Sequence, residues 1–381
     1  MDRVLHVVNS LETGGAEMLL ASLVARTDRS RFDPVVVALC PETAAGPVRE
    51  RILAAGVRIH DLGIRRGLPD PRAIIRLAAV LRRERPAVVQ SWLYHSDAFA
   101  LFASALAGRP PLVWSLWCSD MDMSKYSLGS RILPTVLARL SAWPAAVVTN
   151  SEAGRRAHAA IGYRPRRWEV IPSGFDTGAF RPDDRARVAL RAELGVEPGA
   201  ELVGMVARWD PMKDHRTFLE AAALVRAVRP DVHFVLVGRG VDAANGELAG
   251  RIEALGLGDR VHLLGSRPNV VGVMAAFDVG CLSSRTEGLP GVVAEMMACA
   301  VPCVATDVGD TRHLVADTGA VVPPNDPQAL AAALSEMLAR GAGRRADLGA
   351  AARDRILSAF HQDGFVSRFE ALYASLIGRA A

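Results

Sequence analysis

Short apolar runs alternate with helix-like stretches along the whole chain, and the alternation starts again after residue 200. Repeated alternation of this kind is typical of βαβ units, whose parallel strands are buried beneath helices. The strands expected in the first half lie at 5–11, 34–40, 87–92, 112–117, 146–151 and 168–173. Those expected in the second half lie at 202–209, 233–238, 261–265, 279–283, 302–307 and 319–322. The pattern therefore predicts an α/β protein with two doubly wound domains in series.

The boundary between these domains is predicted at residues 172–184, PSGFDTGAFRPDD, which have the Pro, Gly and Asp content of a linker. A chain of 381 residues also has the length of two domains. We expect an N-terminal domain over 1–175 and a C-terminal domain over 176–360. Helical stretches are expected at 327–340 and 344–378, the second broken near 360–364. The last helix, 361–381, is expected to pack back on the first domain.

Composition excludes several classes of protein. No stretch without Asp, Glu, Lys or Arg exceeds about a dozen residues, whereas a membrane span needs about 20 apolar residues. The N-terminus has the pattern of a strand rather than a signal peptide, which predicts a cytoplasmic protein. Five cysteines, an odd number, argue against a disulfide framework. Cys299 and Cys303 could face each other on a helix, but Pro302 intervenes and no partner completes a zinc site.

Charge is distributed unevenly along the chain. Residues 1–172 carry 23 Lys and Arg against 15 Asp and Glu, a balance of +8, whereas residues 173–381 carry 22 against 26, a balance of −4. A basic half is compatible with nucleic acid, a phosphorylated substrate or an anionic membrane surface. A solvated Arg-rich surface is the alternative.

The turn after the first strand, LETGGAEMLL at 11–20, places Gly14 and Gly15 before a helix. Two glycines let the backbone approach a ligand, and a helix N-terminus attracts anions. The turn lacks both the G-x-G-x-x-G spacing of a dinucleotide site and the Lys of a P-loop. An anion site and a plain strand-to-helix turn therefore both remain open.

Two cations follow the first strand of the second half, in MVARWDPMKDH at 205–215. Arg208 could hold phosphate oxygens bidentately, and Lys213 could act as a point charge. The pair therefore fits a diphosphate, although two surface cations alone would carry no function.

Two carboxylates flank a tight loop in EGLPGVVAEMM at 287–297. We expect a helix to begin near Gly291, which leaves Glu287 in the loop and Glu295 in the early helical turns. The helix N-terminus suits a phosphate, and a nearby carboxylate suits the vicinal hydroxyls of a ribose. The alternative is an ordinary surface Glu that stabilises its own helix.

Taken together and in order, these motifs strongly resemble the retaining glycosyltransferases of the GT-B fold, family 4. Further segments resemble landmarks of that family over nearly the whole chain: VTNSEAGRRAH, VIPSGFD, VHFVLVGRG, ACAVPCVATDVGD and GAVVPPNDPQAL. The resemblance implies a GT-B fold, two Rossmann-like domains facing across a cleft. The first would bind the acceptor and the second the nucleotide sugar.

The resemblance also implies roles for individual residues. Glu295 would bind the donor ribose, and Arg208 and Lys213 would bind its diphosphate. Gly14 and Gly15 would close over the phosphates from the other domain. The sugar and its phosphate would be held by Glu287 and the backbone of Gly288, Leu289, Pro290 and Gly291.

The segment QSWLYHSD at 90–97 resembles the stretch where many family members place a His near the anomeric carbon. His95 is therefore the candidate catalytic His, unless Asp97 simply holds it within the loop. Ala300 stands where the family commonly has Gly, Ser173 where it has Asn, and Gly291 where it has Asn in the sugar loop. These departures leave the sugar preference open.

The expected activity is transfer of a sugar from a UDP- or GDP-sugar to a glycan or polyprenyl-linked acceptor, with retention, in cell-envelope or exopolysaccharide biosynthesis. A sugar phosphorylase, a nucleotide-sugar epimerase and a catalytically silent binding subunit are the alternatives. We expect no cofactor, no metal and no nucleic-acid partner; Asp120 and Asp122 form an Asp-x-Asp pair, but far from the donor motifs. Residues 128–143 could rest on the anionic inner face of the plasma membrane, or form a buried helix broken by Pro134.

Overall fold

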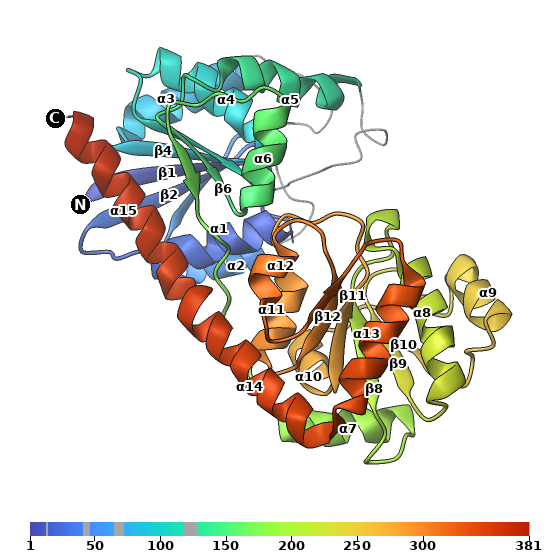
Figure 1. Ribbon diagram of the computed structural model, residues 1–381. Coiled ribbons are helices and arrows are strands. Elements are labelled where there is room, and N and C mark those ends of the chain that lie inside the picture. The colour runs from blue at the N-terminus through green and yellow to red at the C-terminus, as the bar shows by residue number, and fades with distance from the viewer. Residues whose placement is uncertain (13, 41–45, 65–71, 118–127, 381) are drawn as a thin grey trace. The chain divides into compact units, whose positions relative to one another are not determined.

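The computed structural model describes residues 1–12, 14–40, 46–64, 72–117 and 128–380, and it divides the chain into two compact units. The first unit comprises residues 1–174 and 362–381, and the second comprises residues 175–361. Each unit is built on its own parallel β-sheet with helices on both faces (Figure 1).

The first unit has a seven-stranded sheet in the order β3-β2-β1-β4-β5-β6-β7. Its strands are β1 (Asp2–Val8), β2 (Phe32–Ala38), β3 (Arg58–Asp61), β4 (Val88–Trp92), β5 (Leu112–Leu116), β6 (Ala146–Thr149) and β7 (Trp168–Val170). All the pairings are parallel, and the inner strands are buried along almost their whole length. Burial on both faces explains why these strands appear in the sequence as continuous apolar runs.

Helices cover both faces of this sheet. They are α1 (Gly15–Arg26), α2 (Pro47–Ala54), α3 (Arg72–Glu84), α4 (Leu93–Leu106), α5 (Leu128–Leu140), α6 (Glu152–Ala160) and α15 (Gln362–Ala380). Buried residues of α1, α2 and α15 form one core with the sheet, and those of α3, α4 and α5 form the other (Figure 1). The C-terminal helix α15 thus belongs to the first unit, and its Tyr373 hydroxyl donates a hydrogen bond to Gln90 of β4.

The second unit has a six-stranded sheet in the order β10-β9-β8-β11-β12-β13, also parallel throughout. Its strands are β8 (Leu202–Val206), β9 (His233–Val237), β10 (Val261–Leu263), β11 (Val279–Leu282), β12 (Cys303–Thr306) and β13 (Ala320–Val322). The strand order reverses between β8 and β11. In open α/β sheets such a switch point, at the carboxyl ends of the strands, is where ligands bind.

The helices of the second unit again lie in two layers. They are α7 (Asp184–Leu194), α8 (His215–Val228), α9 (Gly246–Ala254), α10 (Val270–Ala275), α11 (Gly291–Ala298), α12 (Thr311–Val315), α13 (Pro327–Ala339) and α14 (Gly341–Ala359), with a 3-10 turn η2 (Pro211–Lys213) before α8. Helices α8, α9 and α13 pack on one face, and α7, α10, α11, α12 and α14 pack on the other.

Several element bounds differ from the sequence prediction. The first strand begins at Asp2 rather than at residue 5, because Arg3 pairs with Asp33 of β2 (2.8 Å) and extends the sheet at its polar end. The edge strand β3, with the sequence RIHD, was missed because it contains no apolar run. Helix α5 is not broken at Pro134, which lies within it.

The cysteines give no sign of a shared chemistry. Cys40, Cys281, Cys299 and Cys303 are buried, and Cys118 lies outside the described residues. Cys299 and Cys303 do not lie on one helix, because α11 ends at Ala298 and Cys303 begins β12. Among the helices of the described residues, none is long and apolar enough to span a membrane.

Candidate active site

The connection from β8 to α8 carries both predicted cations. Arg208 follows β8, and its half-exposed guanidinium donates from Nε and Nη2 to Asp210 Oδ2 at 3.2 and 3.1 Å. The other oxygen of Asp210 accepts the amide of Met212 at 2.9 Å, which caps the turn η2. Arg208 is therefore held by a carboxylate.

Lys213 is likewise paired with a carboxylate. Its Nζ lies 2.6 Å from Oε1 of Glu287, in the loop between β11 and α11, and both side chains are largely buried. The Ser284 hydroxyl donates to the same oxygen at 2.7 Å. The fold thus brings together two predicted residues that are 74 positions apart.

The N-terminus of α11 begins at Gly291, as predicted. Its N-cap is Pro290, no side chain caps it, and its first turn has no acidic residue. Elsewhere in this unit the N-termini of η2, α7, α8, α9, α10 and α13 are capped by Asp or Asn side chains. The start of α11 therefore retains the partial positive charge that attracts an anion.

Glu295 lies on the same helix and is half-buried. Within the described ranges, no hydrogen bond or ion pair reaches its carboxylate. Because burial disfavours the charged form, the pKa of Glu295 rises from 4.5 to about 7. An unpartnered carboxyl group in this position is available to accept hydrogen bonds from a ligand.

The loop before α11 is supported by the turn that follows β12. Gly288 accepts the amide of Asp310 at 2.8 Å through its carbonyl. Gly309 has a φ of +59°, and a Cβ there would collide with the carbonyl oxygens of Glu287 and Gly288. Leu289 and Pro290 are buried. A glycine is therefore required at 309 for this loop to adopt its position.

The predicted residues of the first unit lie at two helix N-termini. Gly14 is the N-cap of α1 and Gly15 its first residue, as expected. The Glu17 carboxylate folds over Gly14 and occupies the space that a Cβ at Gly14 would fill. A negative charge therefore already lies at the helix end predicted to bind phosphate.

His95 is exposed in the first turn of α4. Desolvation by neighbouring atoms lowers its pKa below 6.5. The alternative that Asp97 holds this ring is wrong, because Asp97 is fully buried and accepts the Ser91 hydroxyl at 2.6 Å. Burial raises the pKa of Asp97 well above its ordinary value.

The predicted sites thus fall into two groups. Arg208, Lys213, the loop 287–291 and Glu295 lie in the second unit, whereas Gly14, Gly15 and His95 lie in the first. Asp120 and Asp122 lie outside the described residues. In the part of the chain that the structure describes, no cluster of His, Cys, Asp or Glu could hold a metal ion.

Sequence reasoning missed three residues that shape the site: Asp210, Ser284 and Gly309. The first two stand close to their partners in sequence, two residues after Arg208 and three before Glu287, so local spacing could have identified them. Gly309 gives no such signal, because its contact with residues 287 and 288 depends on how two loops pack.

Comparison with known proteins agrees with this architecture. Two family models match, "Glycosyltransferase Family 4" over residues 13–179 and "Glycosyl transferases group 1" over residues 200–340. The solved structure of HepE from Anabaena, in complex with UDP and glucose, has a TM-score of 0.83 and 23% sequence identity, covering 98% of this chain and all of that one. The fold is therefore that of the GT-B glycosyltransferases.

The chain belongs to the group 1 glycosyl transferases of family 4. D-inositol 3-phosphate glycosyltransferase of Mycolicibacterium gilvum is 38% identical over 185 residues, which cover 46% of this chain and 40% of that protein. The chain thus matches less than half the length of that relative. The putative glycosyltransferase EpsF of Bacillus subtilis is 26% identical over 314 residues, covering 80% of this chain and 79% of that protein.

Proposed function

We propose that this protein transfers a sugar from a nucleoside diphosphate sugar to a glycan or polyprenyl-linked acceptor in polysaccharide biosynthesis, with retention. The observation that carries the proposal is the Lys213–Glu287 pair beside the uncapped N-terminus of α11, at the strand switch point. A UDP or GDP sugar is the proposed donor. HepE, which shares the fold, is described in complex with UDP and with UDP-glucose.

The diphosphate is assigned to the cations and to the start of α11. When the bond between sugar and phosphate breaks, negative charge grows on the leaving diphosphate, and preorganised positive groups stabilise it. Arg208 and Lys213 provide two such groups, and the dipole of α11 provides a third. Each cation must exchange its present carboxylate partner for the phosphate.

The ribose is assigned to Glu295. Its carboxyl group lies on α11, five residues into a helix whose N-terminus faces the phosphate in this proposal. Among the described residues, no side chain forms a hydrogen bond or ion pair with its oxygens. They are therefore available to accept hydrogen bonds from the vicinal hydroxyls of the ribose. The cost of leaving this group buried and unpaired is evident in its raised pKa.

Glu287 is assigned to the transferred sugar rather than to a covalent intermediate. Its Oε1 already accepts bonds from Lys213 and Ser284, which reduces its capacity as a nucleophile. We therefore propose a front-face reaction, in which the acceptor attacks on the side that the diphosphate leaves. His95 and the Gly14–Gly15 turn are further proposed donor contacts, and we propose that no metal takes part.

The test is a screen of UDP- and GDP-sugars for transfer, for hydrolysis and for protection against thermal unfolding. Arg208→Ala and Lys213→Ala should each lower kcat about a hundredfold, as other electrostatic stabilisers do. Lys213→Arg should not restore it fully, because a planar guanidinium does not replace a point charge. Arg226→Ala, which removes a partly buried cation of α8 that pairs with Asp259, is the matched control and should leave kcat unchanged.

Other outcomes would favour the alternatives. Release of sugar phosphate from a glycan would indicate a phosphorylase, and an isomerised donor without an acceptor would indicate an epimerase. Donor binding with no turnover under any condition would indicate a binding subunit. Wild-type kcat in both alanine variants would contradict the assignment of the diphosphate site.

The acceptor is proposed to be collected at a membrane surface by an exposed apolar face of the first unit. This α4–α5 face consists of the exposed side chains Phe102, Leu106, Ile132, Val136 and Trp143, the last 65% exposed. Helices α4 and α5, which carry the first four, pack against each other. Residues 98–117 and 128–151 contain no Asp or Glu, whereas Arg109 and Arg139 there are exposed. Exposed apolar and aromatic side chains, together with exposed arginines and no carboxylate in the same segments, suit an anionic lipid surface.

Sedimentation with vesicles tests this contact. The protein should bind vesicles that contain phosphatidylglycerol more strongly than pure phosphatidylcholine vesicles, and Trp143→Ser should weaken that binding at least fivefold. Val188→Ser, which removes an equally exposed side chain from α7 of the second unit, is the control. Equal binding of both variants, or no binding by the wild-type protein, would contradict the membrane contact.

A further inference from the structure

The two loops that carry Lys213 and Glu287 are joined by hydrogen bonds from neighbouring residues. The amide of Arg285 donates to the carbonyl of Met212 at 2.8 Å. The Ser283 hydroxyl lies 3.0 Å from the Lys213 carbonyl oxygen and 2.9 Å from that of Asp214. These hydrogen bonds therefore link the β8–α8 connection to the β11–α11 connection.

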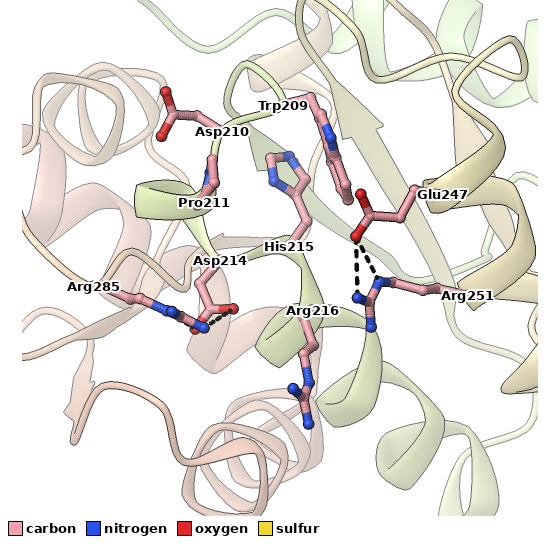
Figure 2. A pocket seen from close by; sticks show the side chains of 9 residues that line it. All are labelled: Trp209, Asp210, Pro211, Asp214, His215, Arg216, Glu247, Arg251 and Arg285. Carbon is pink, nitrogen blue, oxygen red and sulfur yellow. Dashed lines mark hydrogen bonds and ion pairs between the residues drawn. The ribbon is translucent and has the colours of Figure 1, made fainter. Parts of the chain in front are cut away.

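Asp214 is the centre of that junction. It is 3% exposed and has a left-handed backbone, with a φ of 48°. Its carboxylate accepts the Thr217 hydroxyl at 2.8 Å and the Thr217 amide at 3.3 Å, which caps α8. The guanidinium of Arg285 donates to it from Nε at 3.0 Å and from Nη2 at 3.3 Å (Figure 2).

These contacts keep the buried carboxylate charged. Burial by itself would raise the pKa of Asp214, but hydrogen bonds from Arg285 and Thr217 outweigh it and hold the pKa below its ordinary value. A charge at this depth needs a partner, because an isolated buried carboxylate is costly. Arg285 is that partner, and it reaches Asp214 from the other loop.

We propose that the Asp214–Arg285 pair is a positioning element that fixes the Lys213 ammonium relative to the Glu287 carboxylate. Asp214 follows Lys213 directly, and Arg285 precedes Glu287 by two residues, so the pair clamps the backbone of both. Neither side chain needs to touch the donor. This inference rests on the proposed function, since it assigns the pair to the same charge-stabilising site.

The surroundings of Arg285 make the pair accessible to experiment. Its side chain is 48% exposed, so that Arg285→Ala removes the ion pair without emptying a core position. The pair lies at the wall of a hollow of about 240 Å³, which is also lined by Trp209, His215 and Arg251 (Figure 2). Arg251 pairs with Glu247 within α9 at 3.1 Å and, among the described residues, forms no hydrogen bond or ion pair with either loop, so it provides a matched control.

The test is steady-state kinetics on the full chain with the best donor found in the screen. Arg285→Ala should lower kcat at least tenfold and change the donor KM less than threefold, because a displaced Lys213 stabilises the leaving group poorly while ground-state binding persists. Arg285→Lys should restore part of kcat. Arg251→Ala should change neither constant.

A double-mutant cycle separates this inference from the proposed function. Arg285→Ala combined with Lys213→Ala should be less than additive, because the pair acts through Lys213. If Lys213→Ala loses activity but folded Arg285→Ala keeps kcat within twofold of wild type, the positioning role is wrong and the proposed function stands. If Lys213→Ala itself keeps wild-type kcat, the proposed function fails.

Discussion

Replacing Glu295 by Gln should stabilise the ligand-free protein at alkaline pH while it weakens nucleotide binding. The carboxyl group is half-buried without a partner, and its pKa is raised from 4.5 to about 7. A raised folded-state pKa means that the native protein binds this proton more tightly than the unfolded chain. The contribution of this group to native stability is therefore fully present below pH 4.5 and is lost as pH rises through about 7.

The size of the effect follows from the same numbers. A tenfold change in an equilibrium constant is worth about 1.4 kcal/mol. The rise in the pKa of Glu295 from 4.5 to about 7 therefore lowers the free energy of unfolding by roughly 3 kcal/mol above pH 7. At pH 5 the native carboxyl group is protonated, and the free energy of unfolding is lowered by less than about 1 kcal/mol. Gln has nearly the same shape and does not titrate. For a domain of this size, E295Q should therefore melt about 6–12 °C above wild type at pH 8 and about 2 °C above it at pH 5.

The assay is thermal unfolding at both pH values, followed by titration with UDP and GDP. A hydrogen bond to a charged group is worth about 1.5–3 kcal/mol, so that nucleotide affinity should fall about 10- to 150-fold in E295Q. Glu253→Gln, on the exposed side of α9, is the control and should change neither quantity. Equal melting of E295Q and wild type at pH 8 would refute the burial argument, and unchanged nucleotide affinity would refute the ribose assignment.

Four other perturbations test separate features. Gly309→Ala should cost about 1–3 kcal/mol in unfolding free energy and weaken nucleotide binding, because a Cβ there collides with the carbonyl of Gly288; an unchanged melting temperature would contradict this. Asp210→Asn should tighten nucleotide binding up to about fivefold, because the diphosphate no longer has to displace a carboxylate from Arg208; calorimetry that shows weaker binding would overturn it. Ala300→Gly should raise the unfolding free energy by up to about 1 kcal/mol, since Ala300 has a φ of 59°; a lower urea midpoint would speak against strain at this position. Transfer activity should persist in excess EDTA, and a loss that Mg²⁺ or Mn²⁺ restores would show that a metal takes part.

Much of the site is local in sequence, which is why it could be predicted. The apolar runs that follow one another through each half determine both parallel sheets, because strands covered on both faces must be apolar throughout. Pro290 and Gly291 determine where α11 begins, and so place Glu287 in a loop and Glu295 on a helix. The cations Arg208 and Lys213 lie in the connection that follows a buried strand, and the ends of parallel strands lie at one edge of the sheet.

The charge state of the site was decided only by the tertiary structure. Arg208 and Lys213 are paired with Asp210 and Glu287, whereas the sequence had indicated only that two cations suited to a diphosphate follow this strand. The Lys213–Glu287 contact joins two loops from different strands, and no local pattern indicates which side chains of such loops will meet. Burial is also decided by tertiary packing, because the pKa of Glu295 depends on how completely neighbouring helices exclude water. Sequence pattern therefore determines which groups reach the edge of the sheet, and packing determines their partners and protonation.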